Sequence, residues 1–182
     1  MTALLFGEGL ALVRGGRLLF EGLDLTVGKG EAVHVTGPNG SGKSSLLRLI
    51  AGLLEPSAGR IERSDAGLAD DGLALDRELP LGRALAFWEG SRTGAAMAHF
   101  ALDHLAAVPV RLLSSGQAKR ATLARVMASG APLWLLDEPL NALDREGKAR
   151  LESAIAGHRT AGGGVIAASH LALGGAWREL AL

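Results

Sequence analysis

The residues with the clearest chemical meaning form one short run, Gly37-Pro38-Asn39-Gly40-Ser41-Gly42-Lys43-Ser44. It fits the phosphate-loop pattern of a glycine, four free positions and then Gly-Lys-Ser. An apolar run at 32–35 precedes it, and a helical pattern at 46–50 follows it. This is the strand–loop–helix context that gives the pattern its meaning. The alternative is a glycine-rich turn that binds nothing, and the flanking pattern argues against it.

These residue types predict nucleotide binding. The glycines allow successive backbone N–H groups to close around phosphate oxygens, and the following helix adds its positive N-terminal end. Lys43 is expected to reach the β- and γ-phosphates, and Ser44 to hold Mg²⁺ through its hydroxyl. Ser45, the next residue, is assigned to the same site.

A phosphate loop needs a second carboxylate to organise Mg²⁺, usually at the end of a neighbouring buried strand. Asp137 follows the apolar run 133–136 and meets this requirement. Glu138 comes next and is placed to orient the attacking water or accept its proton. A solvated strand end is the common alternative for an Asp-Glu pair, but here the pair ends an apolar strand in a chain that also holds a phosphate loop.

The surrounding pattern predicts how these residues are positioned. Short strands at 10–13, 18–20 and 23–27 predict a small, mostly antiparallel β layer, and the helix after the phosphate loop should end near Gly52. Composition changes between 65 and 110, which indicates a small helical insertion whose best helical stretch is 82–88. Buried strands are expected at 133–136 and 165–169, with a loose C-terminus left open.

Length and composition predict one domain covering 1–182. Lys and Arg balance Asp and Glu at a net charge of zero, and there are no cysteines. Bulk charge therefore gives no sign of nucleic-acid binding, and a disulfide framework is excluded. The first residues lack the pattern of a signal peptide, and no apolar run approaches the ~20 residues that span a bilayer. We expect a soluble intracellular protein that reaches membranes only through partners.

Further motifs give the chain a family resemblance. Leu113-Ser114-Ser115-Gly116-Gln117 resembles the signature motif of ABC-type ATPases and departs from Leu-Ser-Gly-Gly-Gln only at Ser115. The segment 133–138 resembles their Walker B motif, 141–144 their D-loop and His170 their switch histidine. With the phosphate loop these motifs stand in the family's order from Gly37 to His170 and cover most of the chain.

The resemblance implies an α/β fold: a P-loop NTPase (RecA-like) ABC ATPase core with an N-terminal antiparallel β layer and a short helical subdomain at about 66–128. It implies ATP and Mg²⁺ as ligands, with Glu138 as the catalytic base and His170 contacting the γ-phosphate. It also implies an ATP-dependent, head-to-tail homodimer. In that dimer the signature residues Ser114, Ser115, Gly116 and Gln117 complete the partner's site, and Asp144 contacts the opposite subunit.

The sequence departs from the family pattern in two places. The aromatic residue that often stacks on adenine is missing, and Arg14 is the candidate to stack in its place. The insertion contains no glutamine between Arg60 and Pro109, where the family carries one that contacts Mg²⁺. Asp71 is a candidate substitute ligand, and a plain solvated pair with Asp70 is the favoured alternative. Lys119 and Arg120 are expected on a solvated basic face.

Within the family, the short length and the segments 113–121, 133–144 and 79–88 look most like the haem-exporter ATPase of cytochrome c maturation. This implies transmembrane permease partners, a peripheral place on the cytoplasmic face of the inner membrane, and hydrolysis that drives release of haem-loaded chaperone. Phe87 and Trp88 read equally as a docking anchor and as core. Another small ABC exporter, a soluble switch ATPase and a binding module with little turnover remain the alternatives.

Overall fold

The computed structural model describes residues 3–182, so the expectation for the N-terminus falls partly outside the described residues. The chain forms a three-stranded antiparallel sheet of order β2-β1-β4 and a five-stranded sheet of order β5-β6-β7-β3-β8, whose pairings are all parallel. The antiparallel strands are β1 (Leu5–Arg14), β2 (Arg17–Val27) and β4 (Ala58–Arg63). The parallel strands are β3 (Ala32–Thr36), β5 (Ala66–Ala69), β6 (Leu133–Asp137), β7 (Gly164–Ala168) and β8 (Arg178–Ala181).

The antiparallel layer is built on the hairpin of β1 and β2. Gly15 and Gly16 join the strands with φ of 58° and 76°, the positive values that a tight primed turn requires. The sequence predicted two separate strands at 18–20 and 23–27. They form one strand, because Gly22 takes a φ of 62° and lets it bend where the register with β1 shifts.

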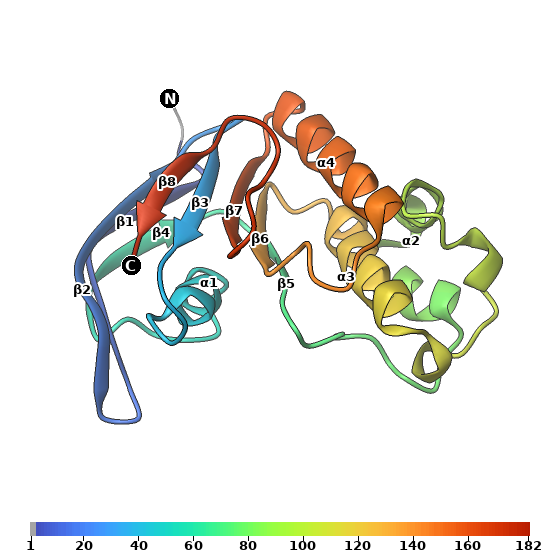
Figure 1. Cartoon of the computed structure of the whole chain (residues 1–182), viewed down its shortest axis with the longest axis horizontal. Coiled ribbons are helices and arrows are strands. Elements are labelled where there is room, and N and C mark those ends of the chain that lie inside the picture. The colour runs from blue at the N-terminus through green and yellow to red at the C-terminus, as the bar shows by residue number, and fades with distance from the viewer. Residues whose placement is uncertain (1–2) are drawn as a thin grey trace.

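The helices lie on opposite sides of the parallel sheet, as Figure 1 shows. They are α1 (Lys43–Ile50), α2 (Leu81–His99), α3 (Ser115–Ser129) and α4 (Arg145–Thr160), with short 3₁₀ turns η1 (Asp103–Leu105) and η2 (Val110–Leu112). Helix α1 lies between the two sheets, whereas α2, α3 and α4 gather beyond the far face. Among residues 3–182, no helix has both the length and the apolar character needed to span a bilayer.

Two hydrophobic cores follow from this arrangement, and strand alternation divides β6 and β7 between them. Leu133, Leu135 and Ile166 pack with α1 and the antiparallel layer. Trp134 and Leu136 face the core of α2, α3 and α4 on the other side. Every residue of both strands is buried, as expected for parallel strands covered on both faces.

Two segments differ from the sequence-based expectation. Residues 66–69, the expected start of the helical subdomain, are instead strand β5 in the parallel sheet, paired with β6. Gly67 allows this, because a Cβ there would lie 3.1 Å from Cγ1 of Val126 on the closely packed α3. The C-terminus, left open as loose, forms β8 and extends the parallel sheet beside β3. The expected start at 66 therefore falls on β5, and the first helix after it is α2; the helical subdomain itself, with its end near 128, stays a prediction.

Candidate active site

The phosphate loop joins β3 to α1 in the predicted context. Gly37, Gly40 and Gly42 take φ of 139°, 80° and 112°, values that side chains other than glycine's rarely adopt. The Nζ of Lys43 donates to the backbone carbonyls of Gly37 at 2.8 Å and Pro38 at 3.0 Å. Helix α1 has no side-chain cap and no acidic residue in its first turn, so its first N–H groups stay available to an anion.

Asp137 ends β6 opposite the start of α1 and is 7% exposed. Burial raises the pKa of its carboxyl, and the nearby carboxylates of Asp71 and Glu138 add to this rise. A hydrogen bond with the Ser44 side chain and the charge of Lys119 act in the opposite direction. Ser44 and Asp137 therefore lie near each other in the lining of one cavity, as a shared Mg²⁺ site requires.

The donor set fits Mg²⁺ better than a metal held by protein alone. Within the described part of the chain, no three or more His, Cys, Asp or Glu side chains gather as metal ligands. Mg²⁺ prefers one or two protein oxygens and completes its octahedron with water and substrate phosphates. The Ser44 hydroxyl and the Asp137 carboxylate supply two such oxygens.

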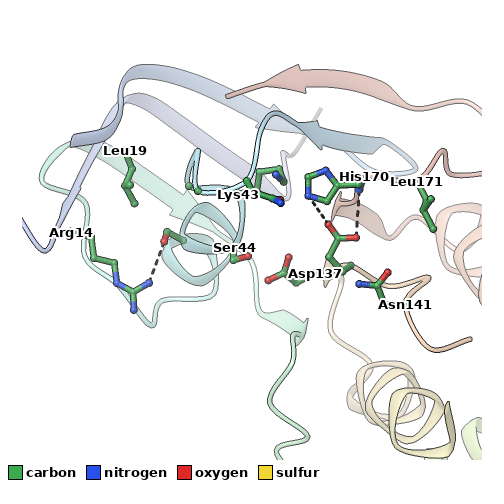
Figure 2. Close-up of a pocket in the computed structure, with 13 residues that line it drawn as sticks. Arg14, Leu19, Lys43, Ser44, Asp137, Asn141, His170 and Leu171 are labelled. Atoms are coloured by element: carbon green, nitrogen blue, oxygen red, sulfur yellow. Dashed lines mark hydrogen bonds and ion pairs between the residues drawn. The ribbon is translucent and has the colours of Figure 1, made fainter. Parts of the chain in front are cut away.

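Glu138 and His170 form a pair at the ends of neighbouring strands (Figure 2). The Nε2 of His170 lies 3.5 Å from Oε1 of Glu138, and the backbone N–H of His170 donates to Oε2 at 3.5 Å. Glu138 has a φ of 42°, in the left-handed region that costs a residue with a side chain about 1–2 kcal/mol. Strain of this kind is concentrated at functional sites.

A cavity of about 710 Å³ brings these groups together. Its lining includes most of the predicted site, namely Arg14, Asn39, Gly40, Gly42, Lys43, Ser44, Ser45, Asp137, Glu138 and His170. It also includes three residues that the sequence did not single out for the site: Leu19, Asn141 and Leu171. Asn141 could have been inferred from its place in the turn just after Glu138, whereas Leu19 gave no signal within its strand.

Arg14 lies at the other end of this cavity from Glu138. In Figure 2, Arg14 and Leu19 stand on one side of Ser44, and His170 stands on the other. The Nη1 of Arg14 donates to Oγ of Ser45 at 3.3 Å, so the guanidinium is tied to α1. Together the two residues offer a planar cation and an apolar side chain.

The signature residues do not line this cavity. Ser114 caps α3 by accepting from the Gln117 N–H, and its own N–H donates to Oε1 of Gln117 at 2.9 Å. Both side chains thus cap their own helix. Ser114, Gly116 and Gln117 line a separate cavity of about 160 Å³ together with Asp144. The Oδ1 of Asp144 accepts from the Gly147 N–H at 2.7 Å and caps α4.

The region expected to hold a glutamine has a different arrangement. Asp70 forms a salt bridge with Arg48 of α1 at 3.1 Å and accepts from the Gly72 N–H at 3.0 Å. The prediction that Asp70 and Asp71 form a solvated pair is therefore wrong for Asp70, because Asp70 is paired with Arg48. Asp71 is exposed and remains a candidate ligand only as a prediction.

Lys119 and Arg120 do not form the expected solvated basic face. The Nζ of Lys119 donates to the backbone carbonyl of Asp137 at 3.0 Å. Burial lowers the pKa of Lys119, against the opposing charges of Asp71, Asp137, Glu138 and Asp70. Arg120 donates to the carbonyl of Phe100 at 3.3 Å. Both cations point inward because α3 packs against the sheet and α2.

Comparison with known proteins shows one family. The ABC transporter family profile matches residues 20–141. The chain is 54% identical to the "Cytochrome c biogenesis ATP-binding export protein CcmA" of Sphingopyxis alaskensis over 95% of this chain and 93% of the relative.

Solved structures show the same fold at low sequence identity. An ATP-binding subunit of an ABC transporter superposes with a TM-score of 0.84 at 23% identity, over 92% of this chain and 80% of that one. A dimeric ATP-binding cassette bound to ADP and phosphate superposes with a TM-score of 0.81 at 22% identity, over 92% of this chain and 88% of that one. These neighbours establish the α/β ABC ATPase fold.

The raised pKa of Asp137 predicts how its replacement changes stability. Because the folded chain holds this proton more tightly than the unfolded chain, stability falls as the pH rises through the pKa of Asp137. Without Mg²⁺ and nucleotide, Asp137→Asn should therefore have a higher Tm than the wild type at neutral pH. The difference should shrink as the pH falls below that pKa.

Thermal unfolding across the pH range checks this, with the exposed Asp103→Asn as a control that should leave Tm unchanged. A lower Tm of Asp137→Asn at every pH would contradict a carboxylate made unfavourable by burial.

Proposed function

The chain belongs to the ABC transporter family, among the cytochrome c biogenesis ATP-binding export proteins, and on this basis we propose that it is the ATP-hydrolysing subunit of such an exporter. Its hydrolysis drives the release of haem-loaded chaperone through transmembrane partner subunits. One observation carries the proposal: a single cavity holds the phosphate loop, Asp137 and the Glu138–His170 pair.

Nucleotide binding uses groups already in position. The N–H groups of the phosphate loop and of the first turn of α1 bind the phosphates, and Lys43 exchanges its two loop carbonyls for phosphate oxygens. Ser44 and Asp137 hold Mg²⁺, which supplies charge neutralisation on the phosphates. Adenine lies at the end of the cavity where Arg14 and Leu19 offer a stacking cation and apolar contact.

Hydrolysis is the attack of water on the γ-phosphorus, with cleavage of the bond between that phosphorus and the bridging oxygen of ADP. Glu138 orients the water and accepts its proton. His170 contacts the Glu138 carboxylate through its Nε2 at 3.5 Å and contacts the γ-phosphate of the bound nucleotide. The donors of the site stabilise the charge that spreads over the transferred phosphoryl group.

A head-to-tail homodimer completes the site. Ser114 and Gln117 cap the N-terminus of α3, and with Gly116 they line a different cavity from the phosphate loop. That N-terminus favours an anion, so Ser114, Ser115, Gly116 and Gln117 serve the nucleotide of a second copy. Asp144 lines the same small cavity and lies in this interface.

A transmembrane permease binds the helical side of the molecule and holds the chain at the cytoplasmic face of the inner membrane. Phe87 of α2 is 83% exposed, so the reading of Phe87 as core is excluded. Its ring meets that of Trp88 edge-on at 5.7 Å. Trp88 is 39% exposed and packs under the Arg125 guanidinium, 4.9 Å from its ring centroid. An exposed aromatic residue that packs on a second aromatic ring, as Phe87 packs on Trp88, is typical of an interface anchor.

Replacing the catalytic base tests the proposed chemistry. Glu138→Gln removes the proton acceptor and should lower the ATP turnover about 10²–10⁴-fold while ATP affinity is retained. Phosphate release by the chain with its membrane partners measures turnover. The exposed Glu55→Gln is the matched control and should hydrolyse ATP at the wild-type rate. Equal turnover in Glu138→Gln and wild type would overturn the assignment of Glu138.

The same variant tests the dimer. Because Glu138→Gln holds ATP without cleaving it, the variant should form a dimer at saturating ATP and Mg²⁺ and remain a monomer without nucleotide. Light scattering after size-exclusion chromatography gives the mass. Glu138→Gln combined with Lys43→Ala should stay monomeric, because it lacks the phosphate contact. A Glu138→Gln variant that is monomeric with bound ATP would exclude the shared site.

The docking surface has its own test. Phe87→Ser removes the exposed aromatic anchor and should cost about 2 kcal/mol of binding to the permease, since anchors of this kind dominate interfaces. Recovery of the permease with a tagged chain from mildly solubilised membranes measures the loss. Leu53→Ser is the control, because Leu53 is 64% exposed and follows α1 away from α2. Wild-type recovery with Phe87→Ser would place the permease elsewhere.

A further inference from the structure

The peptide bond between Asp137 and Glu138 is held from two different elements. On one side its N–H, which belongs to Glu138, donates to the carbonyl of Ala168 in β7 at 2.8 Å. On the other side its C=O, which belongs to Asp137, accepts from Nζ of Lys119 in α3 at 3.0 Å. The plane of this peptide therefore depends both on the sheet and on the helix that begins at the signature.

This peptide sets the direction of the catalytic carboxylate. Glu138 is in the left-handed region at a φ of 42°, a conformation that persists only where the surroundings enforce it. The Glu138–His170 contacts at 3.5 Å are long for hydrogen bonds. The two backbone contacts are shorter than these, so they contribute more to the orientation of the residue.

Lys119 is suited to this task by its surroundings. Its side chain is half-buried and lines a cavity of about 180 Å³, together with Asp70 and Asp71 after β5 and Asn141 in the turn after Glu138. Asp70 and Asp71 belong to the segment between Arg60 and Pro109, which contains no glutamine. From this position the Nζ of Lys119 reaches the backbone carbonyl of Asp137 at 3.0 Å.

We propose that Lys119 is a positioning residue that orients Glu138 through the Asp137 carbonyl and couples it to the signature helix. Lys119 lies one turn after Ser115, the first residue of α3. A shift of α3 against the sheet lengthens or shortens the Lys119 contact and so turns the Asp137–Glu138 peptide. The catalytic carboxylate thereby responds to what binds at the signature end of α3. The inference rests on the proposed role of Glu138 as base.

Lys119→Met keeps the length and apolar stem of the side chain and removes the donor. In single-turnover hydrolysis of ATP by the full chain with Mg²⁺, the rate should fall at least about tenfold, since small misplacements of a catalytic group have effects of this size. ATP affinity and Tm should stay near the wild type, because the P-loop contacts and the cores are intact. Lys119→Arg restores a donor and should recover most of the rate.

Lys29→Met is the matched control, since Lys29 is exposed on the loop before β3 and should leave the rate unchanged. Glu138→Gln runs beside it: an active Glu138→Gln refutes the proposed base, whereas an inactive Glu138→Gln with an active Lys119→Met refutes only the inference. A Lys119→Met variant that loses ATP affinity and Tm in proportion to its rate would show a merely structural role and also refute it.

Hydrogen exchange gives a second measurement that does not depend on turnover. In Lys119→Met the amide of Glu138 should exchange at least about tenfold faster, while the amides of β6 and β7 keep their protection. Unchanged exchange at Glu138 would overturn the inference whatever the activity of the variant.

Discussion

The active site depends on the register of three parallel strands. Ala168 of β7 is paired with Val35 of β3 on one side and with Asp137 of β6 on the other. The three strands therefore end at the same level, and the segments that follow them leave the sheet at one edge. Those segments are the phosphate loop, Glu138 and His170. A slip of one residue between two strands would point each side chain of the slipped strand to the other face and separate Glu138 from the phosphate loop.

Burial allows only one register of these strands, and it also makes the site lower the stability of the folded chain. Strands β6 and β7 are covered on both faces by two cores, which leaves no room for a second register. The same cover raises the pKa of Asp137, and the next residue, Glu138, takes a left-handed backbone conformation. These features destabilise the folded chain and are offset by the cores around them. Such a trade-off is usual where a site is arranged for a charged substrate rather than for its own stability.

The chemical residues could be predicted from sequence, and several structural ones could not. The phosphate loop and the Asp137–Glu138 pair carry their meaning in local spacing, so the sequence placed them in the right context. Strand β8 has no such signal, because its four residues, 178–181, show no buried alternation and form a strand only through pairing with β3. Strand β5 does alternate in burial, but its buried positions are the small residues Gly67 and Ala69, which give no apolar pattern in the sequence. The prediction of a solvated Lys119 was wrong, because its partner is a backbone carbonyl 18 residues away. Every residue has such a carbonyl, so the sequence gives no sign of this contact.

In the proposed dimer, the position of the signature motif means that one copy of the chain holds only part of the chemistry. Ser114 and Gln117 satisfy each other's backbone groups, so the start of α3 is ordered without any ligand. Gly116 is required there, because a Cβ would lie 2.9 Å from the carbonyl of Ala142. An ordered helix N-terminus that is separate from the phosphate loop can act on a phosphate only when another molecule brings one. Hydrolysis would then wait for assembly, and a link from α3 to the Glu138 backbone would let the base respond to that assembly.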